Sequence, residues 1–275
     1  MYPAACLTLK QQALQLLRRA RLLETADAAR FRWLARDSRA ARAAFAQAFG
    51  DAPLPPDDVA YDAYGTLDWT FYWGFGKVVA EFLAPRVRGH AGGAGRVLEW
   101  GCGPARIIRH LPPLLGPGWG VSGSDANPTT IRWCAEHLPG IEFVVNGAAP
   151  PLPFAAATFE SAYAVSVFTH LSVELQRAWA AEVRRVLKPR GLFICTLNGD
   201  ASRSLLTPSE QSTYDRGEPV VRGEVTGGTR CFIAYQPPAY VRNDLLREYD
   251  VVEHLPAPNL FGERQDVWVV KSSAT

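Results

Sequence analysis

A carboxylate followed by a glycine-rich turn is the part of the sequence whose residue types and spacing best suit chemistry. Residues 97–106 read Val-Leu-Glu-Trp-Gly-Cys-Gly-Pro-Ala-Arg. The apolar run 96–100 predicts a buried strand, and residues 106–111 begin a helical pattern directly after the turn. Gly101 and Gly103 let the backbone bend sharply and let a ligand come close. The segment therefore predicts a nucleotide pocket in an α/β protein.

Three later strands also end in polar residues. They are predicted at 119–124, 142–145 and 161–166, and they lead into Asp125, Asn146 and Ser166. The carboxyl ends of parallel strands meet at one edge of an open α/β sheet, which is where such sheets bind ligands. Asp125 lies at the distance from the first turn at which an acidic side chain takes both ribose hydroxyls.

The charges around the first turn distinguish two kinds of cofactor. A dinucleotide lays its pyrophosphate over this turn, where a third glycine permits close packing and a carboxylate would repel the phosphates. Here Arg106 occupies the third-glycine position and Glu99 lies just before the turn. A carboxylate suits a cationic ligand that carries an ammonium and a sulfonium. The sequence thus favours S-adenosylmethionine, and an NAD(P)-dependent oxidoreductase is the weaker alternative.

With these features the chain resembles the class I S-adenosylmethionine-dependent methyltransferases over residues 94 to 271. Besides the first turn, the resemblance is carried by segments in the order and spacing of that family. Ala105 stands where the family often has a glycine, and Asn146 stands where many members have aspartate. Alanine is small enough for the turn, and asparagine can still hydrogen-bond an adenine edge. The segments are Pro-Pro-Leu-Pro-Phe at 150–154, Thr-Phe-Glu at 158–160, Ser-Val-Phe-Thr-His-Leu at 166–171, and Glu-Val-Arg-Arg-Val-Leu-Lys-Pro-Arg-Gly at 182–191.

The resemblance implies a Rossmann-like, seven-stranded, mostly parallel sheet whose last strand is antiparallel. It implies S-adenosyl-L-methionine as the methyl donor, which leaves as S-adenosyl-L-homocysteine. For Asp125, a helix N-cap before Pro128 is the structural alternative to a ribose ligand. The implied donor-binding residues are Glu99, Gly101, Cys102 and Gly103 at the methionine part, Asp125 at the ribose, Ala126 and Asn127 beside the adenine, Asn146, Gly147 and Ala148 at its edge, and Ser166 and Val167 near the methyl group.

His170 is the candidate catalytic base. It follows the fourth strand, beside the expected methyl position, and a histidine with an ordinary pKa of about 6.5 suits proton removal near neutral pH. The competing interpretation is a histidine that caps the next helix or is hydrogen-bonded to the backbone.

We expect a helical extension or cap over residues 1–90, a methyltransferase domain over 91–275, and an acceptor-side insertion at 199–238. Residues 1–50 hold nine basic and three acidic side chains. A basic helical face suits an anionic partner, whereas the plainer interpretation is a solvated helix surface. No nucleic-acid motif accompanies the arginines.

A cluster of aromatic residues lies within the extension. A helix predicted over 67–83 places Trp69, Tyr72, Trp73 and Gly76 on one face. Tyr72 and Trp73 are candidates to close over the donor and stabilise its sulfonium. The alternative is an aromatic seam between the extension and the sheet.

A narrower resemblance covers nearly the whole chain. The segments 49–51, 55–56, 61–65 and 265–266 look like those of bacterial methyltransferases found among genes for cell-surface polysaccharides and other secondary products. This similarity does not define an acceptor. We expect a small-molecule or sugar-bearing acceptor, methylated on oxygen first, nitrogen second and carbon third. A non-catalytic donor-binding sensor or partner subunit is the alternative from another functional class.

The composition is typical of a globular enzyme, with 48% hydrophobic and 20% charged residues. No apolar run approaches the ~20 residues that a membrane span needs. The N-terminus has no secretion-signal pattern, so a cytoplasmic location is expected. The five cysteines are scattered and give no zinc spacing. No carboxylate pair has metal-ligand spacing, and the oligomeric state is not predicted.

Overall fold

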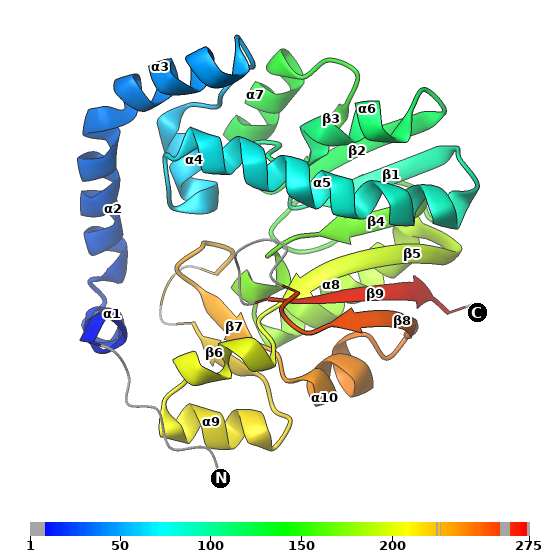
Figure 1. The fold of residues 1–275 in the computed structure, drawn as a ribbon. Helices are drawn as coiled ribbons and strands as arrows, with labels where there is room; N and C mark the ends of the chain where they lie inside the picture. Colours follow the sequence, from blue (N-terminus) through cyan, green and yellow to red (C-terminus); the bar gives the residue numbers. More distant parts are fainter. Residues whose placement is uncertain (1–8, 224, 226, 259–264, 274–275) are drawn as a thin grey trace.

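The computed structural model describes residues 9–273 except 224, 226 and 259–264, and its centre is a seven-stranded sheet (Figure 1). The strand order is β3-β2-β1-β4-β5-β9-β8. Strand β9 runs antiparallel to β5 and β8, while the other pairings are parallel. The predicted Rossmann-like sheet is confirmed. Its strands are β1 (Gly95–Trp100), β2 (Trp119–Asp125), β3 (Glu142–Val145), β4 (Phe159–Ala164), β5 (Leu187–Leu197), β8 (Tyr249–Leu255) and β9 (Asp266–Ser272).

Helices cover both faces of this sheet, and alternate residues of β1 contact the two layers. Leu98 and Trp100 belong to the core shared with α8 and the segment around α10, and Trp100 stacks on Trp179 with ring centroids 4.8 Å apart. Val97 belongs to the opposite core, beneath α5, α6 and α7. The covering elements are α5 (Trp69–Ala91), α6 (Leu111–Leu115), α7 (Pro128–His137), α8 (Val173–Val186), α10 (Pro238–Tyr240) and a π-helical turn at Val241–Leu245.

Helix α5 is longer than the predicted 67–83 and is part of the sheet's core. Val79, Leu83 and Val87 are almost completely buried there. The helix begins with Asp68, whose side chain accepts a hydrogen bond from the Phe71 amide at 2.9 Å, and it ends before Gly92 in a left-handed conformation. A helix from the predicted extension therefore forms one layer of the sheet domain.

The prediction of a helix that starts at Arg106 is wrong in its bounds. Residues 101–107 form turns, a 3₁₀ helix covers Ile108–His110, and α6 covers only Leu111–Leu115. Pro112 and Pro113 occupy the first turn of α6, where their missing N–H groups leave no hydrogen bond unmade. A proline deeper in a helix would remove a backbone bond, so these two prolines hold the helix start at Leu111.

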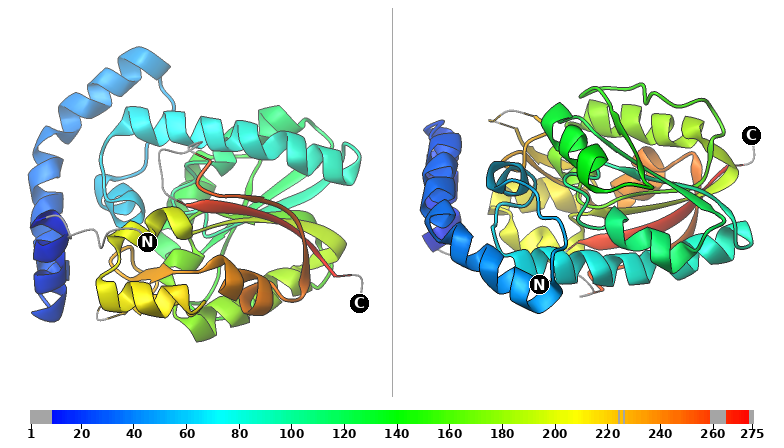
Figure 2. Two further views of the ribbon diagram at one scale, coloured as in Figure 1. Left: turned by 60° about the horizontal axis from the view of Figure 1, so that its bottom comes forward. Right: turned by 90° about the horizontal axis from the view of Figure 1, so that it is seen from above.

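The N-terminal helices pack beside the segment that follows β5, along the carboxyl edge of the sheet (Figures 1 and 2). The Arg18 guanidinium donates to the carbonyls of Arg222 and Cys231 at 2.9 and 2.7 Å. Arg230 forms an ion pair with Asp27. The elements are α1 (Leu9–Arg19), α2 (Leu23–Leu34), α3 (Ser38–Phe49), α4 (Asp57–Tyr64), α9 (Pro208–Asp215), β6 (Val220–Arg222) and β7 (Ile233–Tyr235), with short 3₁₀ turns at Ala35–Asp37, Phe168–His170 and Asp200–Leu205.

The expected helical character of the first fifty residues holds for the part that the structure describes. None of the helices in the described part of the chain is long and apolar enough to cross a membrane.

Candidate functional site

The glycine turn after β1 has the backbone conformation that its sequence predicts. Gly101 and Gly103 have φ values of +74° and +49°, in the left-handed region that favours glycine. A Cβ atom on Gly101 would lie 2.4 Å from Cγ2 of Val167, so the first turn and the end of β4 are in close contact. The structure thus brings together two of the expected donor-binding residues from separate strands.

Asp125 connects this turn to the end of β2. Its Oδ2 accepts a hydrogen bond from the Gly103 amide and its Oδ1 from the Asn127 amide, both at 2.9 Å. The amides of Gly101 and Cys102 donate to the Ser124 carbonyl at 2.8 and 2.9 Å. Three amides of the turn are therefore bonded within the protein. The Cys102 thiol is buried, and its burial raises its pKa well above the usual value.

Helix α7 is capped by Asn127 and not by Asp125. The Asn127 side chain accepts from the Thr129 and Thr130 amides at 3.0 and 3.3 Å. The N-cap alternative considered for Asp125 is therefore wrong. Its carboxylate lies at the carboxyl edge, where burial raises its pKa and the backbone donors oppose that shift. The ribose assignment stays a prediction.

Glu99 is buried on the α5 side of β1. Its Oε2 accepts from the Ile108 amide at 3.1 Å and from the Tyr163 hydroxyl at 3.0 Å. Burial raises its pKa to about 8, against the opposing effects of Tyr163, Arg106 and Ile108. A buried carboxylate close to ionisation is suited to a cationic partner.

Asn146 presents an acceptor atom at the expected adenine edge. Its Nδ2 donates to the Gly147 carbonyl at 2.7 Å, while its buried Oδ1 has no partner among the described residues. Buried polar atoms are nearly always paired, so this oxygen fits a ligand donor such as an exocyclic amine. The other residues expected around the adenine, Ala126, Gly147 and Ala148, are exposed.

A polar network lies where β4 and β5 end and β9 begins, at the same edge of the sheet. The hydroxyls of Ser166 and Thr196 donate to Oε1 of Gln265 at 2.8 and 2.7 Å, and the Ser166 amide donates to the Thr196 hydroxyl at 2.8 Å. Ser166 has a φ of +60°, a conformation that costs energy for a residue with a Cβ and is common at functional sites. The sequence around Thr196 did not predict a site residue, because only the strand order brings Thr196 to Ser166.

His170 has the geometry of a base with a fixed tautomer. Its Nδ1 lies 2.7 Å from the Phe232 carbonyl, which can only accept, so Nδ1 carries the proton and Nε2 keeps its lone pair. Burial lowers its pKa, Arg230 lowers it further, and the bond to Phe232 acts in the opposite direction. The backbone contact of the competing interpretation is present, and the role of His170 as a base stays a prediction.

Tyr72 and Trp73 make different contacts around the first turn. The Tyr72 hydroxyl donates to the Pro104 carbonyl at 2.7 Å, so this residue supports the turn directly. Trp73 contacts Phe45, Phe49 and His110, with ring centroids between 4.6 and 5.9 Å. The contacts of Trp73 are those expected for an aromatic seam between the extension and the sheet. A role for Tyr72 or Trp73 in stabilising a sulfonium stays a prediction.

A cavity of about 280 Å³ opens between α2, α4 and residues 229–231. It adjoins the residues just described, because Asp62 accepts from the Asn127 side chain at 3.5 Å and the Gly228 amide donates to the His170 carbonyl at 3.0 Å. Residues 229–231 belong to the insertion expected on the acceptor side, whereas sequence reasoning missed the lining residues of α2 and α4. The cavity is lined by Glu24, Asp27, Ala28, Phe31, Asp58, Tyr61, Asp62, Thr229, Arg230 and Cys231.

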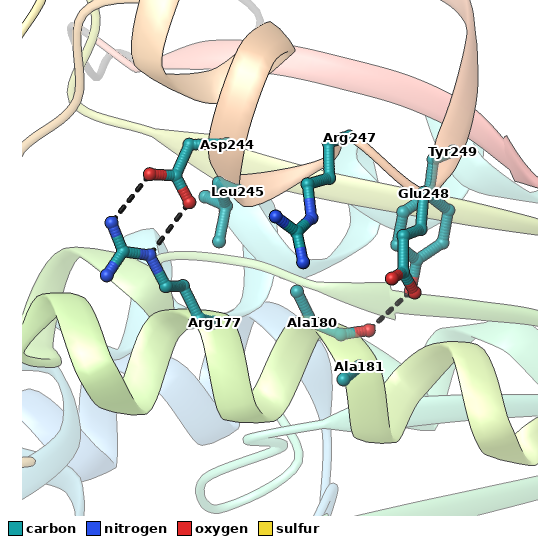
Figure 3. A pocket seen from close by; sticks show the side chains of 8 residues that line it. All are labelled: Arg177, Ala180, Ala181, Asp244, Leu245, Arg247, Glu248 and Tyr249. Atoms are coloured by element: carbon teal, nitrogen blue, oxygen red, sulfur yellow. Dashed lines mark hydrogen bonds and ion pairs between the residues drawn. The ribbon is translucent and has the colours of Figure 1, made fainter.

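A second cavity, of about 300 Å³, lies between α8 and residues 244–249 (Figure 3). Arg177 and Asp244 form an ion pair of 2.6 Å across it, and the Tyr249 hydroxyl donates to the Ala180 carbonyl at 2.7 Å. None of the expected site residues lines this cavity, and its polar groups are used in contacts that join α8 to the last part of the chain.

Comparisons with known proteins agree with this fold. Residues 97–191 match a family described as a methyltransferase domain. The chain is similar to an S-adenosylmethionine-dependent methyltransferase of Methanosarcina mazei, at 20% identity and a TM-score of 0.51 over 70% of this chain and 98% of the other. A protein of Pyrococcus horikoshii gives 18% identity and a TM-score of 0.52, over 78% and 95% of the two chains.

The 1,6-didemethyltoxoflavin-N1-methyltransferase of Burkholderia thailandensis gives 16% identity and a TM-score of 0.54, over 81% of this chain and 93% of the other. It was solved with 1,6-didemethyltoxoflavin and S-adenosylhomocysteine bound. At these identities the structural likeness shows the fold.

Proposed function

We propose that this chain, whose residues 97–191 match a methyltransferase domain, is an S-adenosylmethionine-dependent enzyme that methylates a small-molecule or sugar-bearing acceptor, with oxygen as the favoured atom. The cavity between α2, α4 and residues 229–231 is the observation that supports this acceptor class. Its volume of about 280 Å³ lies near the lower end for small-molecule sites. We place the acceptor there.

The lining of this cavity suits neutral hydroxyl-rich or amine-bearing molecules. Four carboxylates line it, and the Phe31 and Tyr61 rings, 5.0 Å apart, supply apolar surface. Carboxylates accept hydrogen bonds from sugar hydroxyls and attract ammonium groups. The four arginines of the insertion are paired with carboxylates, which disfavours an anionic acceptor; the pairs are Arg203–Asp215, Arg216–Glu218, Arg222–Glu210 and Arg230–Asp27.

The chain's own residues then align the acceptor and remove a proton. Bound S-adenosylmethionine supplies an electrophilic methyl group on its sulfonium. The protein holds this donor through Glu99, Asp125 and Asn146, which fit its ammonium, ribose and adenine by their charge and unused acceptor capacity. His170 takes the acceptor proton at Nε2, since its Nδ1 proton is held by the Phe232 carbonyl.

Nitrogen is the second atom to test, because the Burkholderia enzyme is an N1-methyltransferase. The oxidoreductase alternative is set aside, because the matched family is a methyltransferase domain. The expectation of a cytoplasmic protein stays a proposal. Its support is that Cys102, Cys134, Cys195 and Cys231 are free thiols; Cys6 lies outside the described residues.

The test is an acceptor screen with methyl-labelled donor. The purified protein is incubated with sugars, nucleotide sugars, phenols and amines, and S-adenosylhomocysteine release is measured together with the methylated atom by mass spectrometry and NMR. We expect labelling of a small hydroxylated acceptor. Labelling confined to protein or nucleic acid, or donor binding with no transfer to any class, would refute the proposal.

A matched pair of variants locates the acceptor. Asp58→Asn removes one carboxylate from the cavity and should raise the acceptor KM while the Kd of S-adenosylhomocysteine stays the same. Glu81→Gln removes an exposed carboxylate on α5 that does not line the cavity, and should change neither value. Equal KM values for both variants would place the acceptor elsewhere.

A further inference from the structure

Arg106 is a buried cation that lacks an anionic partner. Its side chain is 8% exposed and lies directly after the glycine turn. Its guanidinium lies over the rings of Phe75 and Tyr64, at 3.8 and 4.2 Å from their centroids. Nε has no hydrogen-bond partner, and no carboxylate among the described residues forms an ion pair with this side chain. The aromatic rings offset part of the desolvation cost, but a buried charge ordinarily also has an anion or hydrogen-bond acceptors.

Tyr64 brings a second unused donor to the same place. It lies at the end of α4, and its buried hydroxyl has no partner within the described structure. The hydroxyl oxygen is 3.2 Å from the position that a Cβ on Gly103 would take. Burial raises the pKa of Tyr64 well above its usual value, so the hydroxyl keeps its proton and can donate it in a hydrogen bond.

The glycine turn itself offers few free donors. The amides of Gly101, Cys102 and Gly103 are bonded to Ser124 and Asp125. An anion bound at this turn must therefore be held by side chains, and Arg106 and Tyr64 are the two that approach it with unused donors. Glu99 lies near enough to influence the pKa of Tyr64 and to be influenced by the charge of Arg106. The site thus has a cation and an anion for the two charged groups of an amino acid.

We propose that Arg106 and Tyr64 bind the carboxylate of the donor's methionine part, while Glu99 binds its ammonium. This inference rests on S-adenosylmethionine as the donor and not on the acceptor proposed above. It gives helix α4 a role in the reaction, because Tyr64 closes over the donor. It also explains why Arg106 is tolerated in the core without a partner in the chain.

The test compares two ligands that differ by one group. S-Adenosylhomocysteine carries both the ammonium and the carboxylate, and its decarboxylated analogue, S-adenosyl-3-thiopropylamine, carries only the ammonium. Calorimetry gives the Kd of each ligand for the wild type, Arg106→Met and Tyr64→Phe. We expect the wild type to prefer S-adenosylhomocysteine by about 100-fold, because hydrogen bonds to charged groups are among the stronger ones.

Arg106→Met should raise the Kd of S-adenosylhomocysteine about 30-fold, and Tyr64→Phe should raise it about fivefold. The Kd of the decarboxylated analogue should change by less than about threefold in both variants. The preference for the carboxylated ligand then shrinks in both variants. Equal losses for the two ligands would indicate a purely structural role, and unchanged binding of S-adenosylhomocysteine would also refute the proposal. Tyr64→Phe removes a single oxygen, so it decides the matter if Arg106→Met does not fold.

Arg109→Met is the matched control. Arg109 lies three residues after Arg106 and is partly buried, with two guanidinium nitrogens that have no partner among the described residues. It contacts the rings of Tyr72, Trp73 and Trp133 instead of Tyr64. We expect its preference between the two ligands to equal that of the wild type. No acceptor is present in these measurements, so the outcome is independent of the acceptor screen.

Discussion

The proposed donor side and the proposed acceptor side of this molecule are built from contacts of different range. On the donor side, the turn of residues 101–103 is bonded to Ser124 and Asp125, about twenty residues along the chain. On the acceptor side, Arg230 reaches Asp27 and Arg18 reaches the Cys231 carbonyl, more than two hundred residues away. The proposed donor side is thus encoded in strands that neighbour each other, whereas the proposed acceptor cavity forms only where residues 229–231 of the insertion meet the N-terminal helices.

The contact of α5 with the glycine turn gives the largest expected effect. A Cβ on Gly76 would lie 1.8 Å from the Arg106 carbonyl oxygen, whereas a Cβ on Gly74, on the same helix, meets nothing within 4 Å. Gly76→Ala should therefore lower the free energy of unfolding by about 3 kcal/mol and abolish donor binding. Gly74→Ala should raise the free energy of unfolding by about 0.5 to 1 kcal/mol, because alanine is the better helix former.

Urea unfolding and calorimetry with S-adenosylhomocysteine measure both effects. If Gly76→Ala were as stable as Gly74→Ala and bound the ligand normally, α5 would not be what holds the donor turn. The donor side would then depend on the sheet alone.

His170 lies where the two sides meet, so its replacement should separate them. His170→Asn can still donate to the Phe232 carbonyl but has no basic nitrogen. We expect unchanged S-adenosylhomocysteine binding and a kcat about 100-fold lower, the usual scale for a lost general base. The wild-type kcat should rise with pH through a point below 6.5, since burial lowers the pKa of His170. A variant with wild-type turnover would show that the base lies elsewhere.

This contrast also explains which parts were predictable from the sequence. The strand at 142–145 was predicted at its observed bounds, and β1 and β2 within one residue, because buried strands between turn residues give a clear apolar pattern. The carboxyl-edge positions of Asp125 and Asn146 followed from the strand order that such sheets adopt. Residue types and local spacing were sufficient to place these residues at the carboxyl edge; their roles toward the donor stay predictions.

Other features depended on tertiary contacts. The shortened helix at 111–115 reflects the two prolines at its start, which the apolar pattern alone obscured. Tyr64 and Arg106 meet only because α4 packs onto the first turn, and Thr196 meets Gln265 only because β5 pairs with β9. The cavity carboxylates come from α2 and α4, whose positions no local pattern specifies.

The ribose assignment of Asp125 predicts the next largest effect on the donor side. Asp125→Ala should weaken the binding of S-adenosylhomocysteine by about 1 to 3 kcal/mol, since it removes one partner of a buried charged hydrogen bond. It also frees the Gly103 and Asn127 amides. A 2′,3′-dideoxy analogue of the ligand separates the two causes, because its affinity should respond less to the substitution. Equal responses of both ligands would leave Asp125 with a role in the turn only.

Glu99 predicts a pH dependence that belongs to the donor side alone. Burial raises its pKa to about 8, so the free protein holds this carboxyl largely protonated at neutral pH. An ammonium bound beside it favours the ionised form. Affinity for S-adenosylhomocysteine should therefore rise as the pH rises from 6.5 to 7.5, by up to about tenfold, which is about 1.4 kcal/mol for one proton.

Glu99→Gln should remove this slope, while a Tyr61→Phe variant in the acceptor cavity should keep it. The same pKa shift makes the stability of the free protein depend on pH. A carboxyl whose pKa is raised by folding stabilises the fold at low pH and loses that contribution as the pH rises through its folded value. Glu99→Gln should thus melt progressively higher than the wild type as the pH approaches 9, although it binds donor more weakly. The other titratable and charged groups around Glu99 are unchanged in this variant, so a slope that persisted in Glu99→Gln would move the titrating group to one of them. These groups are Arg106, Asp125, Tyr163, Tyr64, Tyr72, Cys102 and Cys134.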